Sequence, residues 1–99
     1  MTRVQLLLGK VAEECNEVAQ RALKAQQFGL NEVQEGQTLN NLERLKKEFS
    51  DLLVVSRMLE FDIDGDFTGY PSDIVELEKM QRVEDYIKLS QKLGMVGKK

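Results

Sequence analysis

Residues 2–28, TRVQLLLGKVAEECNEVAQRALKAQQF, repeat apolar side chains every three or four positions. At about 100° per residue, these side chains gather along one face of a helix. The face contains Val4, Leu7, Leu8, Val11, Cys15, Val18 and Ala22. Gly29 follows directly and is a common C-terminal signal. The stretch therefore predicts a long amphipathic helix that ends near Phe28 and has Cys15 in its packed core.

A second helix is predicted after the polar loop at residues 31–37. It begins at Thr38 or Asn40, since either side chain can cap a helix, and it runs to about Phe61. Its apolar face contains Leu42, Leu45, Phe49, Leu52 and Leu59. A further loop at residues 62–71 is expected to follow it.

A third helix is predicted from a cap at Ser72 to about Gly94, and residues 95–99 are expected to fray. One face of this helix contains Leu77, Met80, Val83, Ile87 and Ser90. No stretch alternates with period two over the length of a strand. The predicted fold class is therefore all-α, with three long helices in a single domain, residues 1–99.

The composition is that of a soluble globular protein, with 41% hydrophobic and 31% charged residues. The net charge of −3 argues against binding nucleic acid through its phosphates. The chain has no histidine, which excludes histidine catalysis, and its single cysteine is typical of a reducing compartment. No long apolar run or signal-peptide pattern is present. We therefore expect a cytoplasmic protein with no membrane partner.

Four carboxylates stand out because two of them interrupt an apolar face. On the predicted second helix, Glu48 and Asp51 lie among residues of the buried sector, where unpaired carboxylates are costly. On the first helix, Glu14 and Glu17 are also three positions apart and project from one side. Two such pairs are suited to a hard cation such as Mg²⁺, which prefers oxygen ligands. The alternative is a solvated face with salt bridges to Lys10, Arg21 or Arg44.

These segments resemble a known family. Residues 13–17, EECNE, and 48–53, EFSDLL, are similar to the EExxE and ExxD motifs of the MazG-like all-α NTP pyrophosphatases, in their short stand-alone form. Further likeness lies in Lys24 with Phe28 and Gly29, in residues 41–45 (NLERL), and in residues 79–83 (KMQRV) followed by Tyr86. The resemblance covers roughly residues 6–94. The loop at residues 31–37 makes the spacing between the two motifs long for the family.

The resemblance implies hydrolysis of a nucleoside triphosphate between the α- and β-phosphates, giving a nucleoside monophosphate and pyrophosphate. It assigns Glu14, Glu17, Glu48 and Asp51 to Mg²⁺, with Mn²⁺ as a substitute. Because histidine is absent, the general base would be a carboxylate, and Glu17 and Glu48 are the candidates. Because the long spacing between the motifs departs from the family pattern, we expect the 31–37 loop to be an elaboration that shapes the nucleoside pocket.

Basic and aromatic side chains are the candidates for holding the substrate. They are Lys24, Lys79, Arg82 and Tyr86, with Phe28 and Phe67 as further stacking candidates, although core packing is the favoured role of Phe28. The acids Asp62, Asp64 and Asp66 have the 1, 3, 5 spacing of a calcium loop. Phe67 stands where such a loop needs glycine, so we interpret them as an acidic turn.

Assembly is predicted from apolar residues on more than one face. On the second helix, Val54, Met58 and Phe61 lie well round from the main apolar face. A three-helix monomer would leave them in water, so we expect a homodimer, or a dimer of dimers, that completes a helical bundle. Two other functions stay open, namely a non-enzymatic helical interaction module and a nucleotide-binding sensor with little turnover.

Overall fold

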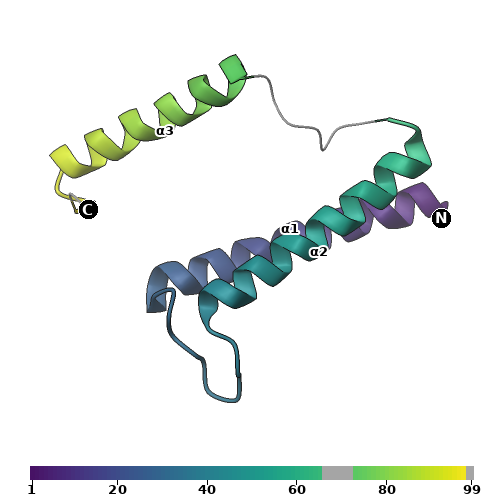
Figure 1. The fold of residues 1–99 in the computed structure, drawn as a ribbon, viewed down its shortest axis with the longest axis horizontal. Coiled ribbons are helices and arrows are strands. Elements are labelled where there is room, and N and C mark those ends of the chain that lie inside the picture. The colour runs from purple at the N-terminus through teal and green to yellow at the C-terminus, as the bar shows by residue number, and fades with distance from the viewer. Residues whose placement is uncertain (66–72, 98–99) are drawn as a thin grey trace. The chain divides into compact units, whose positions relative to one another are not determined.

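The computed structural model describes residues 1–65 and 73–97. Three helices occur in these ranges, and no strand does: α1 spans Arg3–Phe28, α2 spans Asn41–Ile63 and α3 spans Asp73–Lys92 (Figure 1). The all-α prediction is confirmed for the described residues. None of the helices described has the length and apolarity needed to cross a membrane.

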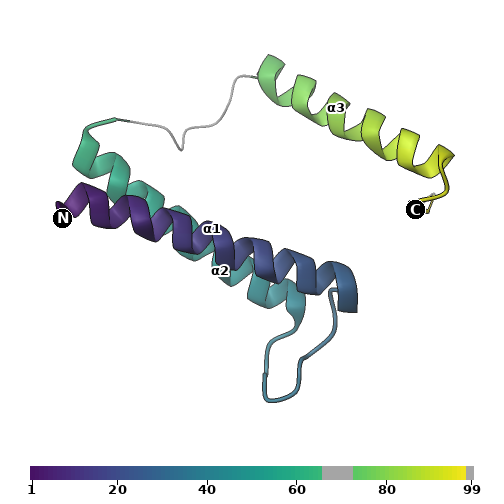
Figure 2. The same ribbon diagram turned by 180° about the vertical axis from the view of Figure 1, so that it is seen from behind.

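The chain divides into two units, Met1–Thr68 and Gly69–Lys99, and each is described by itself. In the first unit, α1 and α2 lie side by side and antiparallel, as the two opposite views show (Figures 1 and 2). An ion pair between Arg3 and Asp62 joins the start of α1 to the last turn of α2. The second unit contains α3. The prediction of a single domain over residues 1–99 stays a prediction.

The side of α1 that faces α2 follows a heptad pattern. Seven residues of α1 are buried or half-buried, and they recur at alternating steps of three and four. They are Val4, Leu7, Val11, Glu14, Val18, Arg21 and Ala25. Such spacing keeps one line of side chains in contact with a neighbouring helix over the whole length of both. This line is called the seam below.

The seam on α2 has the same spacing. It contains Asn41, Leu45, Glu48, Leu52, Val55, Leu59 and Asp62, all buried or half-buried. The buried apolar core is small, because only Leu7, Ala25 and Leu59 are buried apolar side chains among the described residues. A two-helix hairpin therefore leaves much apolar surface exposed.

The observed seam corrects the predicted apolar face. Leu8, Cys15 and Ala22 were expected in the core of α1, but all three are exposed. Phe49 of α2 is likewise 54% exposed. The apolar residues of each helix span a wider arc of its circumference than one neighbouring helix can contact. Helix α2 therefore covers only one edge of the apolar face of α1. That edge includes the charged positions Glu14 and Arg21.

The helix termini show the predicted stop at Gly29 and one of the two predicted caps of α2, and they add a cap at Thr2 that the sequence did not single out. Thr2 caps α1 and forms a reciprocal capping box with Gln5, while Gly29 ends the helix with a φ of 94°. Asn40, and not Thr38, caps α2. Beyond α3, Gly94 has a φ of 75°, and the Met95 N–H donates to Ser90 O at 2.8 Å. Ser72, the predicted cap of α3, lies outside the described residues.

Asn41 fixes the connection between the two helices, a role that its sequence position did not indicate. Its side chain is 1% exposed, and its Nδ2 donates to Gly29 O at 2.8 Å and to Glu32 Oε1 at 3.2 Å. Its backbone N–H donates to Glu32 O at 2.9 Å, and the next N–H, of Leu42, donates to Leu30 O at 3.0 Å. The N–H groups that a helix start leaves unpaired are thus used to close the hairpin.

We predict that Asn41→Ala lowers the free energy of unfolding by about 1–3 kcal/mol, because it removes two hydrogen bonds and leaves buried acceptors unpaired. Asn31→Ala, at an exposed position of the same connection, is the control and should change stability by less than about 0.5 kcal/mol. Urea unfolding followed by circular dichroism measures both variants. Equal stabilities for the two variants would show that Asn41 does not hold the connection.

Candidate metal centre

The predicted carboxylates lie near the middle of the α1–α2 hairpin. Glu14 and Glu48 occupy seam positions, and both are half-buried. Glu17 and Asp51 each lie three residues further along the same helices, on one flank of the seam. The antiparallel contact therefore brings together two motifs that are 30 residues apart in the sequence.

Three of the four carboxylates form a compact group. Glu14, Glu17 and Glu48 each place one carboxylate oxygen within 4.8 Å of the other two. Asp51 is not part of this group, and its Oδ2 lies 3.9 Å from Lys47 Nζ. The negative charge of Asp51 nevertheless raises the pKa of both Glu14 and Glu48, so it acts on the group at short range.

Two oxygens of the group are buried without a hydrogen-bond partner among the described residues, namely Glu14 Oε2 and Glu48 Oε2. The alternative of salt bridges to Lys10, Arg21 or Arg44 is not observed for Glu14, Glu17 or Glu48 in the described part of the chain, whereas Asp51 pairs with Lys47. Lys10 instead pairs with the exposed Glu13 at 3.1 Å, and Arg44 donates to Gln34 at 2.7 Å. Buried acceptors that lack donors are costly, so the arrangement is suited to a bound cation.

The electrostatics of the group favour protonation when no cation is bound. Burial raises the pKa of Glu14 above its ordinary 4.5, and the charges of Glu17, Asp51 and Glu13 add to the effect. A hydrogen bond shared with the Glu17 carboxyl raises the pKa of Glu48, together with burial and the charge of Glu17. Nearby lysines, Lys10 for Glu14 and Lys47 for Glu48, offset these shifts only in part.

The donor set fits a small hard cation. Mg²⁺ prefers carboxylate oxygens at about 2.1 Å, so that neighbouring oxygens of its octahedral shell are about 3 Å apart and opposite ones about 4 Å. Oxygens that all lie within 4.8 Å of one another are near enough to share one such ion after small side-chain movements. The exposed Glu17 marks the side on which the group opens to solvent, and this side is called the carboxylate mouth below.

The predicted substrate residues are placed on two elements. Lys24 lies on α1, two turns after Glu17, with its Nζ 5.6 Å from the centre of the Phe28 ring. Phe28 is 46% exposed and is not a core residue. Lys79, Arg82 and Tyr86 lie along one face of α3, where with Val83 they line a shallow hollow of about 500 Å³. Phe67 lies outside the described residues.

The acidic turn differs from the loop that was expected. Asp62 belongs to the last turn of α2 and pairs with Arg3, and its side chain is only 13% exposed. Asp64 follows the helix in the left-handed conformation, with a φ of 52°. Asp66 lies outside the described residues. At the end of α2, Asp62 therefore forms an ion pair with Arg3, and Asp64 caps the helix.

The raised pKa values predict a pH dependence of stability in the absence of divalent cations. The folded chain binds more protons than the unfolded chain above pH 4.5, so stability is lost as the pH rises through the folded-state pKa values. We expect the melting temperature in EDTA to be higher near pH 5 than near pH 7.5. Glu48→Gln should flatten this dependence, whereas Glu35→Gln, at an exposed loop position, should not. Identical profiles for wild type and Glu48→Gln would contradict the assignment.

Comparison of the chain with protein-family models, with characterised proteins and with solved structures gave no match.

Proposed function

We propose that the chain is a cytoplasmic, Mg²⁺-dependent nucleoside triphosphate pyrophosphohydrolase that releases a nucleoside monophosphate and pyrophosphate. The observation that carries this proposal is the group of Glu14, Glu17 and Glu48, with two buried, unpartnered oxygens in a helix seam. The resemblance of residues 13–17 and 48–53 to the EExxE and ExxD motifs supplies the reaction class.

The cost of the carboxylates supports a functional role for them. Apolar side chains at positions 14 and 48 would extend the seam and raise stability, since the neighbouring seam residues are apolar. Destabilising groups that persist within a packed element are typical of functional sites. A salt-bridge role is less well supported, because Lys10 and Arg44 are engaged with Glu13 and Gln34.

In this proposal Glu14, Glu17 and Glu48 hold the metal, and Asp51 joins them by releasing Lys47. When bound, Mg²⁺ would neutralise phosphate charge and make a nearby water more acidic. Glu48 is one candidate to accept a proton from the attacking water, because its carboxylate belongs to the same group. Glu17 is the second candidate base, since it is exposed at the carboxylate mouth.

The proposed phosphate-binding groups are cations on α1 and α3. Lys24 lies on the same flank of α1 as Glu17, about 10 Å further along the helix axis. Lys79, Arg82 and Tyr86 share one face of α3, so two cations and an aromatic ring can contact one phosphorylated ligand. The substrate is a nucleoside triphosphate, with no role for nucleic acid or membrane.

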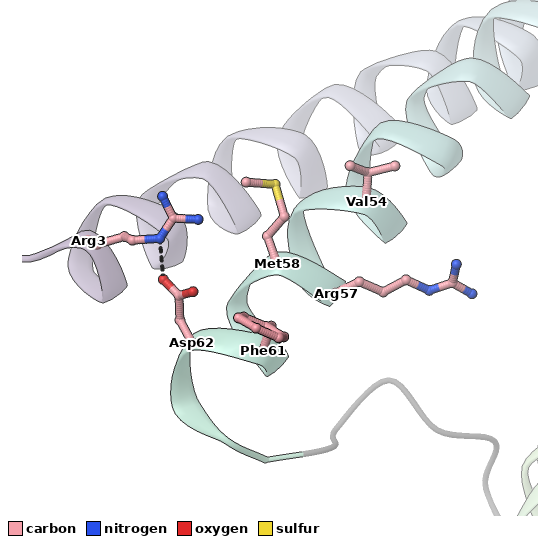
Figure 3. Close-up of a pocket in the computed structure, with 6 residues that line it drawn as sticks. All are labelled: Arg3, Val54, Arg57, Met58, Phe61 and Asp62. Atoms are coloured by element: carbon pink, nitrogen blue, oxygen red, sulfur yellow. Dashed lines mark hydrogen bonds and ion pairs between the residues drawn. The ribbon is translucent and has the colours of Figure 1, made fainter.

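A second candidate is a non-enzymatic interaction module, which is favoured by the exposed apolar residues of α2. Val54, Met58 and Phe61 are 58%, 42% and 88% exposed, and they line a hollow of about 380 Å³ beside Arg3 and Asp62 (Figure 3). The same residues support a homodimer of the enzyme. Thermal stability separates the two functions, because ligand binding to the folded state raises it. Millimolar Mg²⁺ should stabilise a metalloenzyme and leave a module unchanged.

For the reaction itself, we predict that nucleoside triphosphates yield monophosphate and pyrophosphate only with Mg²⁺ or Mn²⁺. Resolving the products of a nucleotide panel by ion-exchange chromatography tests this expectation. Glu48→Gln should abolish turnover, because it removes both a metal ligand and a candidate base, and the helical content should stay unchanged. Glu84→Gln, at an exposed position of α3 away from the hollow lined by Lys79, Arg82 and Tyr86, is the matched control and should retain activity. Diphosphate and free phosphate as primary products would exclude this reaction, and Mg²⁺ stabilisation without turnover would indicate a sensor.

For assembly, we predict a particle of at least twice the 11.3 kDa chain mass at micromolar concentration. Met58→Lys should halve the mass found by light scattering, because it places a charge in an apolar contact. Gln27→Lys, an exposed change on α1 away from the seam, should leave the mass unchanged. A fully active 11.3 kDa monomer would contradict the predicted dimer.

A further inference from the structure

Charged residues on the side of the carboxylate mouth follow one register between α1 and α2. Arg3 pairs with Asp62 (Figure 3), and Glu17 shares a hydrogen bond with Glu48 near the middle of the hairpin. From the first pair to the second, the chain advances 14 residues along α1 and goes back 14 residues along α2. Both helices rise by the same distance per residue, so equal steps along each of them lead from one facing pair to the next.

Four residues further along this register, two arginines face each other. Arg21 follows Glu17 by about one turn of α1, and Arg44 precedes Glu48 by about one turn of α2. Residues four apart share a helix face, so both arginines lie on the side of the carboxylate mouth, and both are half-buried. We call them the arginine pair. Like charges on facing turns of neighbouring helices repel each other, so the pair is stabilised by an anion bound between them.

Most hydrogen-bond donors of the arginine pair are unused by the described residues. A guanidinium group is always charged and carries five N–H donors. Arg44 donates to Gln34 Oε1 at 2.7 Å. Among residues 1–65 and 73–97, Arg21 has no side-chain hydrogen bond and no ion pair, and no acid pairs with Arg44. The remaining donors are therefore available to a ligand.

The acids nearest to the arginine pair have other partners. Glu17 places a carboxylate oxygen within 4.8 Å of oxygens of Glu14 and Glu48. Glu43, on the first turn of α2, accepts a hydrogen bond from the Asn40 backbone N–H at 3.1 Å and so completes the helix cap. The side chains of the described residues therefore leave the two positive charges without a neutralising partner.

The chemistry of the arginine pair is suited to a diphosphate group. A guanidinium fork binds phosphate oxygens through two parallel N–H bonds, and two facing forks can hold two linked phosphate groups. Lys24, already proposed as a phosphate-binding residue, lies three residues after Arg21 on the same side and adds a third positive charge. The carboxylate group lies one turn away, about 6 Å along the helix axis, so the two sites are adjacent.

We propose that Arg21 and Arg44 bind the two terminal phosphate groups of the nucleoside triphosphate, which leave as pyrophosphate. The identity of this ligand rests on the proposed function. The proposal also gives Gln34 a positioning role, because its side-chain oxygen accepts a hydrogen bond from the Arg44 guanidinium. The loop at residues 31–37 is thereby connected to substrate binding.

Titration calorimetry with inorganic pyrophosphate in millimolar Mg²⁺ tests the proposal. Arg21→Met and Arg44→Met should each weaken pyrophosphate binding about ten-fold or more, because each removes a charged fork and keeps an apolar stem. Lys46→Met, at an exposed position on the opposite side of α2, removes the same charge and should change the affinity less than about two-fold. Equal affinities for the wild type and both arginine variants would overturn the proposal.

Two further measurements separate ligand binding from folding. Arg21→Lys keeps the charge and loses the fork, so it should still weaken pyrophosphate binding several-fold, and it serves as the test if Arg21→Met does not fold. Titration with Mg²⁺ alone should give no weaker binding in any arginine variant, because the removed charge repels the cation. A parallel loss of Mg²⁺ affinity would show that the arginines support the fold of the site, and it would overturn the proposal.

The same titrations distinguish a failure of this proposal from a failure of the proposed function. Arginine-dependent pyrophosphate binding by a chain that hydrolyses no nucleoside triphosphate would support the diphosphate site and contradict the reaction. Turnover with arginine-independent pyrophosphate binding would do the reverse. A wild-type chain that binds no pyrophosphate, with or without Mg²⁺, would overturn the proposal. Sulfate bound as tightly as pyrophosphate would also overturn it, because the arginines would then form a simple anion site.

Discussion

The heptad contact between α1 and α2 is the interaction on which the rest of the structure depends. Its apolar layers, with Leu7, Ala25 and Leu59 buried, hold two long helices antiparallel. Each end of the contact is fixed by a polar tie: the Arg3–Asp62 ion pair at one end and the buried Asn41 at the other. Because both ties are specific in position, they set the register in which residues of α1 face residues of α2. That register brings Glu14 next to Glu48.

Glu14 and Glu48 destabilise this contact, because their carboxyl groups are half-buried in the seam. The same burial contributes to their raised pKa values. Seam positions are partly removed from water, which penalises a charge there, and the charges of Glu17 and Asp51 increase the penalty. Without a cation the raised pKa values of Glu14 and Glu48 favour protonation, which lowers the penalty. If the proposed metal binds here, folding, protonation and metal binding would be coupled through the same two side chains. A hairpin whose middle is destabilised in this way gains from contacts made elsewhere.

Those contacts are available, because a two-helix hairpin cannot enclose its own apolar side chains. Leu8 and Phe49 on one side, and Met58 and Phe61 on the other, remain exposed beside the seam. A chain of 99 residues buries a modest share of its surface in any case, so association with further helices is the usual remedy. The two apolar sides flank the hairpin differently, since only the side with Met58 lies near the carboxylate mouth.

The sequence by itself determined the three helices, the stop at Gly29, a cap at Thr38 or Asn40, and the conflict of the acids at positions 48 and 51 with an apolar face. These follow from local backbone chemistry and from periodicity, which act within a few residues. Only the tertiary structure decided that Cys15 is exposed, that Asn41 is buried, and that Glu14, Glu17 and Glu48 meet while Asp51 turns to Lys47. The apolar pattern of α1 is wider than any single contact, so it does not say which edge α2 covers. That choice depends on the register of two helices, and the register is set by side chains far apart in the chain.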